Sequence, residues 1–160
     1  MTSILKVSEI QDPTNSNTAL SIDSSGIIST SQLQYITLLR NATVNYSAGA
    51  TIADWRLAES NGITESSGVC TVSVAGVYLI SISVISAATN GMEFFYNGTK
   101  QFRPGYGAIG SGEAWSTIAN CFAWTLSASD TVEFKAQGLM QIYGASDNST
   151  VGSWSMVKIG

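Results

Sequence analysis

The sequence predicts an all-β protein, folded as a two-sheet antiparallel sandwich. Residues 69–85 carry the strongest signal, because apolar and polar side chains alternate there at every second position, as on a strand with one face in a core. Valine, isoleucine, threonine and tyrosine suit such a half-buried surface. Asn97-Gly98 adds a two-residue hairpin turn, which needs positive φ at both positions. The alternation predicts a core face made of Cys70, Val72, Val74, Tyr78, Ile80, Ile82 and Val84.

The remaining strands follow from the same alternation and from turn residues. Ala75-Gly76 is expected to bend the chain between two apolar runs, and Asn61-Gly62 to turn it into the strand at Val69. Around Ile52 and Trp55 a helical turn and an irregular strand both fit the pattern. At residues 132–137 the alternation predicts a strand with Glu133, Lys135 and Gln137 on a wet face. Further strands are expected at 35–40, 92–96, 99–102, 115–126, 140–143 and 154–159.

The strand at 115–126 has no charge on either face. Its bulky face carries Ile118, Phe122, Trp124 and Leu126, and its small face carries Thr117, Ala119, Cys121, Ala123 and Thr125. Such a strand is expected to be covered on both sides. We therefore expect another copy of the chain to cover the small face around a three-fold axis, with an interface at Thr117, Ala119, Cys121 and Ala123. A helix or arm of the same chain is the alternative cover.

Residues 103–112 are rich in glycine but lack the lysine and following serine or threonine of a phosphate-binding loop. The segment is expected to be a flexible surface loop. Arg103, Tyr106 and Trp115 are the candidate ligand contacts, because exposed aromatics beside a polar loop can stack on a sugar or a partner. An ordinary rim of the fold is the alternative interpretation.

Residues 1–33 are expected to form an attachment arm, separate from a head at 34–160. Their short strands and polar turns supply too few apolar side chains for a core of their own. An extra edge hairpin of the same domain is the alternative. The apolar anchors of the arm are Ile4, Val7, Ile10, Leu20 and Ile22.

Composition narrows the function. Only 11% of the 160 residues are charged and the net charge is −4, a profile typical of extracellular or virion β-proteins. Without a basic stripe, nucleic acid is not an expected partner. The start shows no signal-peptide pattern and no apolar run is long enough for a membrane span, so synthesis in a host cytoplasm is expected without membrane insertion. Cys70 and Cys121 are expected to be reduced and buried.

No reactive constellation is evident. The sequence has no histidine, which removes the commonest general base and most zinc sites. The acidic residues are scattered, and their spacing selects no pair for glycoside hydrolysis. Calcium at Asp130 or Asp147 is an alternative to solvated loop acids, although no dense Asp-x-Asp loop exists. We expect no enzymatic activity and no cofactor.

Four segments in order resemble the C1q and tumour-necrosis-factor superfamily of jelly rolls. They are AGVYLISISV from Ala75, MEFFYNGTK from Met92, LSASDTVEF from Leu126 and SWSMVKI from Ser153. The sequence departs from the family at Ser129, where glycine is usual, and at Trp154 and Met156, where phenylalanine and glycine are usual. The resemblance implies a C1q-like head, a homotrimer and, in some heads, bound calcium.

The opening SILKVSEIQ…IDSSGIIS resembles the N-terminal leader of virion proteins from tailed phages of marine bacteria and cyanobacteria. With the head, it predicts a bacteriophage structural protein, displayed on the virion as a short fibre or knob for host attachment. The arm would contact other virion proteins, and the head a host glycan or protein. A capsid decoration protein and a free carbohydrate- or protein-binding module are the alternatives.

Overall fold

The computed structural model describes residues 9–11, 18–22, 24–25, 28–29, 33–87, 90–107, 115–145 and 151–160. These residues form strands, turns and connecting segments, with no helix among them. No described helix is therefore available to cross a membrane. The chain separates into two compact units, Met1–Leu33 and Gln34–Gly160. Each unit is described by itself.

The N-terminal unit contains a small antiparallel sheet in the order β1-β2-β3. Ile10 and Leu20 are register partners on the first pair of strands, and Ile22 pairs with Ile28 on the second. Ile10, Leu20 and Ile22 of the predicted anchors therefore lie on strands, whereas Ile4 and Val7 lie outside the described residues. The strands are β1 (Glu9–Gln11), β2 (Thr18–Ile22) and β3 (Ile28–Ser29).

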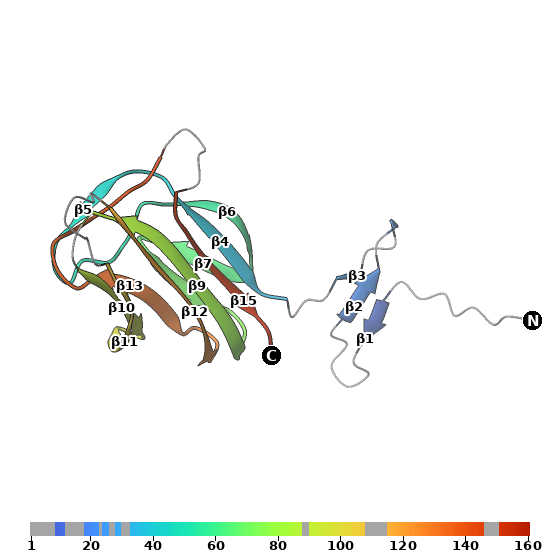
Figure 1. Ribbon diagram of the computed structural model, residues 1–160. Helices are drawn as coiled ribbons and strands as arrows, with labels where there is room; N and C mark the ends of the chain where they lie inside the picture. The colour runs from blue at the N-terminus through green and yellow to red at the C-terminus, as the bar shows by residue number, and fades with distance from the viewer. Residues whose placement is uncertain are drawn as a thin grey trace, which may run out of the picture. The chain divides into compact units, whose positions relative to one another are not determined.

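The head is the predicted sandwich of two antiparallel sheets (Figure 1). A five-stranded sheet has the order β11-β10-β13-β8-β7, and a seven-stranded sheet has the order β5-β14-β9-β15-β4-β6 with β12 paired to β9. The smaller sheet comprises β7 (Ile63–Ser66), β8 (Val69–Val72), β10 (Gly91–Tyr96), β11 (Thr99–Tyr106) and β13 (Thr131–Ala136). The larger comprises β4 (Tyr35–Arg40), β5 (Val44–Tyr46), β6 (Trp55–Asn61), β9 (Gly76–Ser86), β12 (Ser116–Leu126), β14 (Met140–Ile142) and β15 (Ser153–Lys158).

The core lies between the two sheets and follows the predicted alternation except at Val74, which is only half-buried. On β9 the inward side chains are almost fully buried, at 0–1% exposure, and they are Tyr78, Ile80, Ile82 and Val84. Aromatic rings from both sheets fill the centre, where Phe134 of β13 meets Trp154 of β15 edge-on at 5.1 Å. Each large apolar side chain buried in this way contributes about 1.5–3 kcal/mol. The core therefore stabilises the pairing of the two sheets.

Residues 69–85 form two strands that belong to different sheets. Cys70 and Val72 of β8 are buried from the smaller sheet, and β9 belongs to the larger one. The chain bends at Ser73 and Val74, so the prediction of a turn at Ala75-Gly76 was two residues late. The Tyr78 hydroxyl donates to the Val74 carbonyl oxygen at 2.6 Å, which holds this crossing in place.

The hairpin prediction is confirmed, and a neighbouring turn prediction was wrong. Asn97 and Gly98 have φ of 47° and 72°, as a two-residue turn between β10 and β11 requires. Gly62, with φ of 68°, instead joins β6 directly to β7, where the chain passes from one sheet to the other. The turn into Val69 is formed by Ser67 and Gly68, whose φ values are also positive, at 51° and 83°.

The segment predicted as a flexible loop from Arg103 begins as a strand. β11 continues to Tyr106, and residues 108–114 lie outside the described residues. Pro104 is tolerated because β11 is the edge of its sheet, where a missing N–H breaks no ladder. Gly105 is needed because a Cβ there would lie 2.5 Å from Ile118 Cγ2 of β12. Glycine here therefore permits close packing between the sheets.

The ambiguity around Ile52 and Trp55 resolves in favour of a strand. β6 starts at Trp55, after a bend in which Asp54 has φ of 60°. Ile52 is fully buried and accepts a hydrogen bond at its carbonyl from the Trp55 indole, at 2.7 Å. The local spacing resembled a helical turn because this short bend places both side chains on the core.

One predicted wet face on β13 is partly covered. Glu133 is only 8% exposed, because Thr51 donates a hydrogen bond to its carboxylate at 2.7 Å and Lys135 lies 3.2 Å away. The segment before β6 pairs with the end of β13 that β8 does not reach, through a bridge between Thr51 and Lys135. Alternation alone could not predict that Thr51 covers Glu133, because the two residues are more than 80 positions apart in the chain.

Candidate functional site

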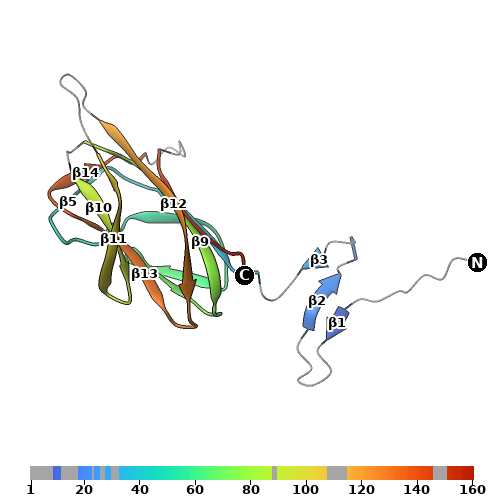
Figure 2. The ribbon, with the colours of Figure 1, turned by 60° about the horizontal axis from the view of Figure 1, so that its bottom comes forward.

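The outer side of the seven-stranded sheet is the largest candidate surface. β9 and β12 run antiparallel over eleven register pairs without a bulge (Figure 2). Side chains that alternate away from the core therefore form ordered rows. On these two strands the outward residues are Val77, Leu79, Ser81, Ser83, Ile85, Thr117, Ala119, Cys121, Ala123 and Thr125.

The rows continue across β15 and β4 by register. Ser155 lies opposite Ser81 on one side and Thr37 on the other. The additional outward residues are Ser153, Ser155, Val157, Tyr35, Thr37 and Leu39. We call this four-strand surface the outward face. It carries no charged side chain until β6, where Glu59 lies opposite Thr37.

The predicted trimer residues all lie on the outward face. Thr117, Ala119, Cys121 and Ala123 are exposed on the single chain, and Leu79 beside them is 37% exposed. The described residues of the head provide no helix and no strand over this surface, so the alternative of a same-chain helix finds no support there. The lack of charge and the exposed aliphatic side chains on this surface are typical of a protein contact.

The two cysteines have different environments. Both are free, as predicted. Cys70 is fully buried on β8, and desolvation raises the pKa of its thiol well above the usual range. Cys121 is exposed on the outward face of the single chain, so its predicted burial depends on another copy covering that face. β12 is an outer strand of its sheet, and β9 is the one described strand that pairs with it.

The head has two distinct ends. Gln34, where the head begins, accepts a hydrogen bond from the Lys158 amide at 2.8 Å, and Gly160 accepts one from Val77 at 2.7 Å. The start of β4 and the C-terminus therefore lie at the same end (Figure 1), which we call the proximal end. β9 runs from there for eleven residues, roughly 33 Å, to the distal end.

Two exposed aromatic rings meet at the distal end. Trp115 precedes β12 and Tyr143 follows β14, and their ring centroids are 5.3 Å apart at an interplanar angle of 66°. They are 37% and 38% exposed. With Ile85 of β9 they line a pocket of about 290 Å³. We call these three residues the aromatic patch.

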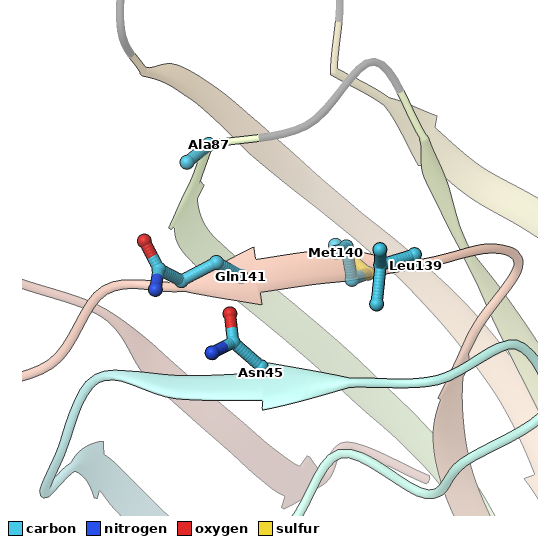
Figure 3. Close-up of a pocket in the computed structure, with 5 residues that line it drawn as sticks. All are labelled: Asn45, Ala87, Leu139, Met140 and Gln141. Atoms are coloured by element: carbon cyan, nitrogen blue, oxygen red, sulfur yellow. The ribbon is translucent and has the colours of Figure 1, made fainter.

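A second pocket lies beside the patch across β14. It measures about 470 Å³, and its described lining residues are Asn45, Ala87, Leu139, Met140 and Gln141. Asn45 and Gln141 are register partners on β5 and β14, and Figure 3 shows the Asn45 side chain reaching toward β14 and the Gln141 side chain extending along its own strand. We call them the amide pair. Neither amide has a hydrogen-bond partner among the described residues, so both retain donors and acceptors for a ligand.

The three predicted ligand contacts are not brought together. Trp115 packs on Tyr143, which the sequence had assigned only to a closing strand. Tyr106 is 55% exposed at the distal end of β11, where the neighbouring Gly107 amide donates to Asn90, but it has no ring contact with Trp115. Arg103 lies along the strand, 3.9 Å from the Glu93 carboxylate.

The sequence reading missed Tyr143, Asn45 and Gln141. Alternation could have identified two of them. Gln141 and Tyr143 alternate with the buried Met140 and Ile142, so they lie on the outer side of β14. Nothing local shows that this strand lies beside the end of β9. That contact is made by the Tyr143 amide, which donates to the Ile85 carbonyl oxygen at 2.9 Å.

Asp130 serves the fold and not a cation. Its Oδ1 accepts a hydrogen bond from Asn97 Nδ2 at 2.8 Å, while Oδ2 accepts from the Tyr96 hydroxyl at 2.8 Å and the Ser127 amide at 2.7 Å. These donors, Asn97 first, lower the pKa of the carboxyl. Donors turned toward both oxygens do not fit a calcium site. No group of three potential metal ligands occurs in the described part of the chain, and Asp147 lies outside it.

Comparison with known proteins supports the fold. No protein family matches the sequence, and no curated protein resembles it significantly. Among solved structures, the TNF protein Eiger from S. frugiperda matches with a TM-score of 0.63 and 15% identity, over 80% of this chain and 93% of that one. Murine APRIL matches with a TM-score of 0.64 and 14% identity, over 80% of this chain and all of that one. The head therefore has a TNF-like jelly-roll fold.

Proposed function

We propose that the chain is a non-enzymatic structural protein of a tailed-phage virion, whose homotrimeric head is displayed as a short fibre or knob for binding the host surface. The observation that carries the proposal is the uncharged outward face, exposed on the single chain and spanning four strands. A second copy that buried it would desolvate no charge, so association would carry no penalty from charge burial. Three copies closing around an axis would cover the central rows of all three of these faces.

The two ends of the head suit a displayed module. The N-terminal unit joins the head at Gln34, at the proximal end, which would attach the protein to other virion proteins. The three exposed aromatic side chains of the described head, Tyr106, Trp115 and Tyr143, lie at the distal end, roughly 33 Å away. A trimer would present three distal surfaces together, so weak single contacts would add to a useful avidity.

Two measurements test this function. The mass of the purified chain at micromolar concentration should be three times 16.8 kDa. A variant lacking residues 1–33 should still have three times the mass of its own shortened chain, fail to join phage particles during infection, and still compete with phage for host cells. A monomeric mass would reject the trimer, and normal incorporation of the shortened variant would reject attachment through the N-terminal unit. Stabilisation of capsids without any competition for cells would instead identify a capsid decoration protein.

A further inference from the structure

We infer that the aromatic patch and the amide pair together form a binding site for an uncharged saccharide. This inference rests on the host-binding role proposed above, and it specifies the chemical class of the ligand and the residues that contact it. The structure supports it through the arrangement of the two groups on one side of one sheet, through their free surfaces, and through the absence of charge among the described lining residues.

The register of four strands makes the site continuous. The Ala87 amide donates to the Gln141 carbonyl oxygen at 3.0 Å, and Gln141 lies opposite Asn45. In the next row, Tyr143 lies beside Ile85, which pairs with Thr117 of β12. Adjacent strands lie about 4.8 Å apart, so the four strands cover roughly 14 Å. The aromatic rings and the amides therefore belong to one surface.

A sugar ring offers two kinds of surface, and the site offers a complement to each. Carbon-bound hydrogens give one face of a pyranose an apolar character, which suits the edge-to-face pair of Trp115 and Tyr143 over Ile85. Hydroxyl groups around the ring both donate and accept hydrogen bonds, as the amides of Asn45 and Gln141 do. A pocket of mostly apolar lining with a few placed polar groups is typical of small-ligand sites.

Charge decides between saccharide classes. None of the described residues that line the two pockets is charged: Asn45, Ile85, Ala87, Trp115, Leu139, Met140, Gln141 and Tyr143. An acidic sugar brought to such a lining would lose hydration without gaining an ion pair. The site therefore favours neutral hexoses or N-acetylhexosamines over sialylated or uronate-containing chains.

The test uses the full chain and an array of neutral and acidic oligosaccharides. Neutral chains should bind, and titration with one of them should change the indole fluorescence, because Trp115 is exposed whereas Trp154 is fully buried. Trp115→Ala and Tyr143→Ala should each weaken binding about tenfold, as loss of an aromatic contact near 1.4 kcal/mol implies. Gln141→Ala should weaken it about fivefold.

Leu57→Ala is the matched control, since Leu57 is 54% exposed on β6, outside both pockets. It should bind like the unmodified chain, and every variant should keep the same oligomeric mass. An equal loss in Leu57→Ala would reject the location. Dissociation of Trp115→Ala into monomers would show that the aromatic patch is a contact between copies and would also reject the site.

Adsorption of fluorescently labelled chain to marine bacterial and cyanobacterial cells separates the two proposals. One outcome is that the chain adsorbs to cells while no neutral oligosaccharide binds it or inhibits that adsorption. This result would overturn the saccharide site and leave the proposed host binding in place. Absence of adsorption to every strain, together with a silent array, would overturn both proposals. Adsorption inhibited by a neutral oligosaccharide and weakened by Trp115→Ala is the expected result.

Discussion

Cys121 of β12 lies directly opposite Ser81 of β9, and both project from the uncharged outward face, midway along their strands. On the single chain the thiol is open to solvent. If copies of the chain close over this face, the same thiol becomes inaccessible. Cys121 is thus a natural reporter of assembly, and Cys70, buried in the core, does not interfere.

We predict that Ala119→Arg converts the trimer into folded monomers. Ala119 is exposed on the single chain, so the substitution leaves the core intact, but an arginine at the interface would be a buried charge without a partner. The measurements are mass at micromolar concentration and maleimide labelling. Cys121 should react in the variant and resist in the unmodified chain.

Ser66→Arg is the control for this substitution, because Ser66 is exposed on β7, at the edge of the other sheet. It should keep the trimeric mass and the protected thiol. Rapid labelling of Cys121 in the unmodified chain, with mass unchanged by Ala119→Arg, would contradict the role of the outward face.

Ser129→Gly should stabilise the head. Ser129 has φ of 72°, a left-handed conformation that is strained for serine and free of strain for glycine. Relief of this strain outweighs the extra chain entropy of glycine in the unfolded state, so we expect a gain of about 0.5–1 kcal/mol and a Tm about 3 °C higher. Thermal unfolding measures it.

Ser127→Gly, two residues earlier and without positive φ, should instead lower the Tm. A fall in Tm for Ser129→Gly as well would mean that the serine side chain contributes more than its backbone strain costs. The family resemblance had marked position 129 as unusual for lacking glycine, and the observed φ gives the reason glycine suits it.

Acid should destabilise the head partly through Asp130. Hydrogen bonds from Asn97, the Ser127 amide and Tyr96 lower the pKa of its carboxyl in the folded state. The unfolded chain then takes up a proton at higher pH than the folded one, so this contribution is complete above the unfolded pKa of about 3.9 and is lost as pH falls through the lower folded pKa.

Denaturant unfolding at a series of pH values tests this assignment. Asp130→Asn should reduce stability near neutral pH and show a smaller further loss below about pH 4 than the unmodified chain. Identical pH dependence in the two proteins would show that other carboxyls cause the acid sensitivity. Cys70 and Tyr78, whose pKa values are raised by burial, do not titrate in this range.

Arg40→Ala should destabilise the head severely. Arg40 is 1% exposed, its guanidinium donates to the carbonyl oxygens of Ala42 and Ala53, and it lies 5.0 Å from the ring centre of Trp55. Removing it takes a donor from the Ala42 carbonyl oxygen and leaves a void beside the indole, while the Ala53 carbonyl oxygen keeps its hydrogen bond from the Tyr46 hydroxyl. We therefore expect a loss of about 3–5 kcal/mol in denaturant unfolding.

Arg103→Ala provides the comparison. The Arg103 side chain is 42% exposed, and its one ion pair among the described residues, with a Glu93 oxygen, is long, at 3.9 Å. Its loss should cost less than about 1 kcal/mol. If Arg40→Ala were equally mild, the hydrogen bonds and ring contact of Arg40 would be incidental to stability.

The sequence by itself determined the inward and outward side of most strands. Alternation at β9 and β12 assigned Tyr78 and Ile118 to the core and Ala119 to the opposite side, because a pleated strand fixes the side of each residue from its own position. The hairpin turn at Asn97-Gly98 could also be predicted from the local sequence, since positive φ at two successive residues requires particular residue types.

Only the tertiary structure decided which strands became neighbours. Trp115 and Tyr143 lie far apart in the chain, and they meet because β12 and β14 flank the distal end of β9. The strand form of Arg103–Tyr106 likewise depends on pairing with β10 and packing against Ile118. Strand pairing depends on the apolar surface that all the strands of the sandwich bury together, which cannot be deduced from the sequence of any one strand.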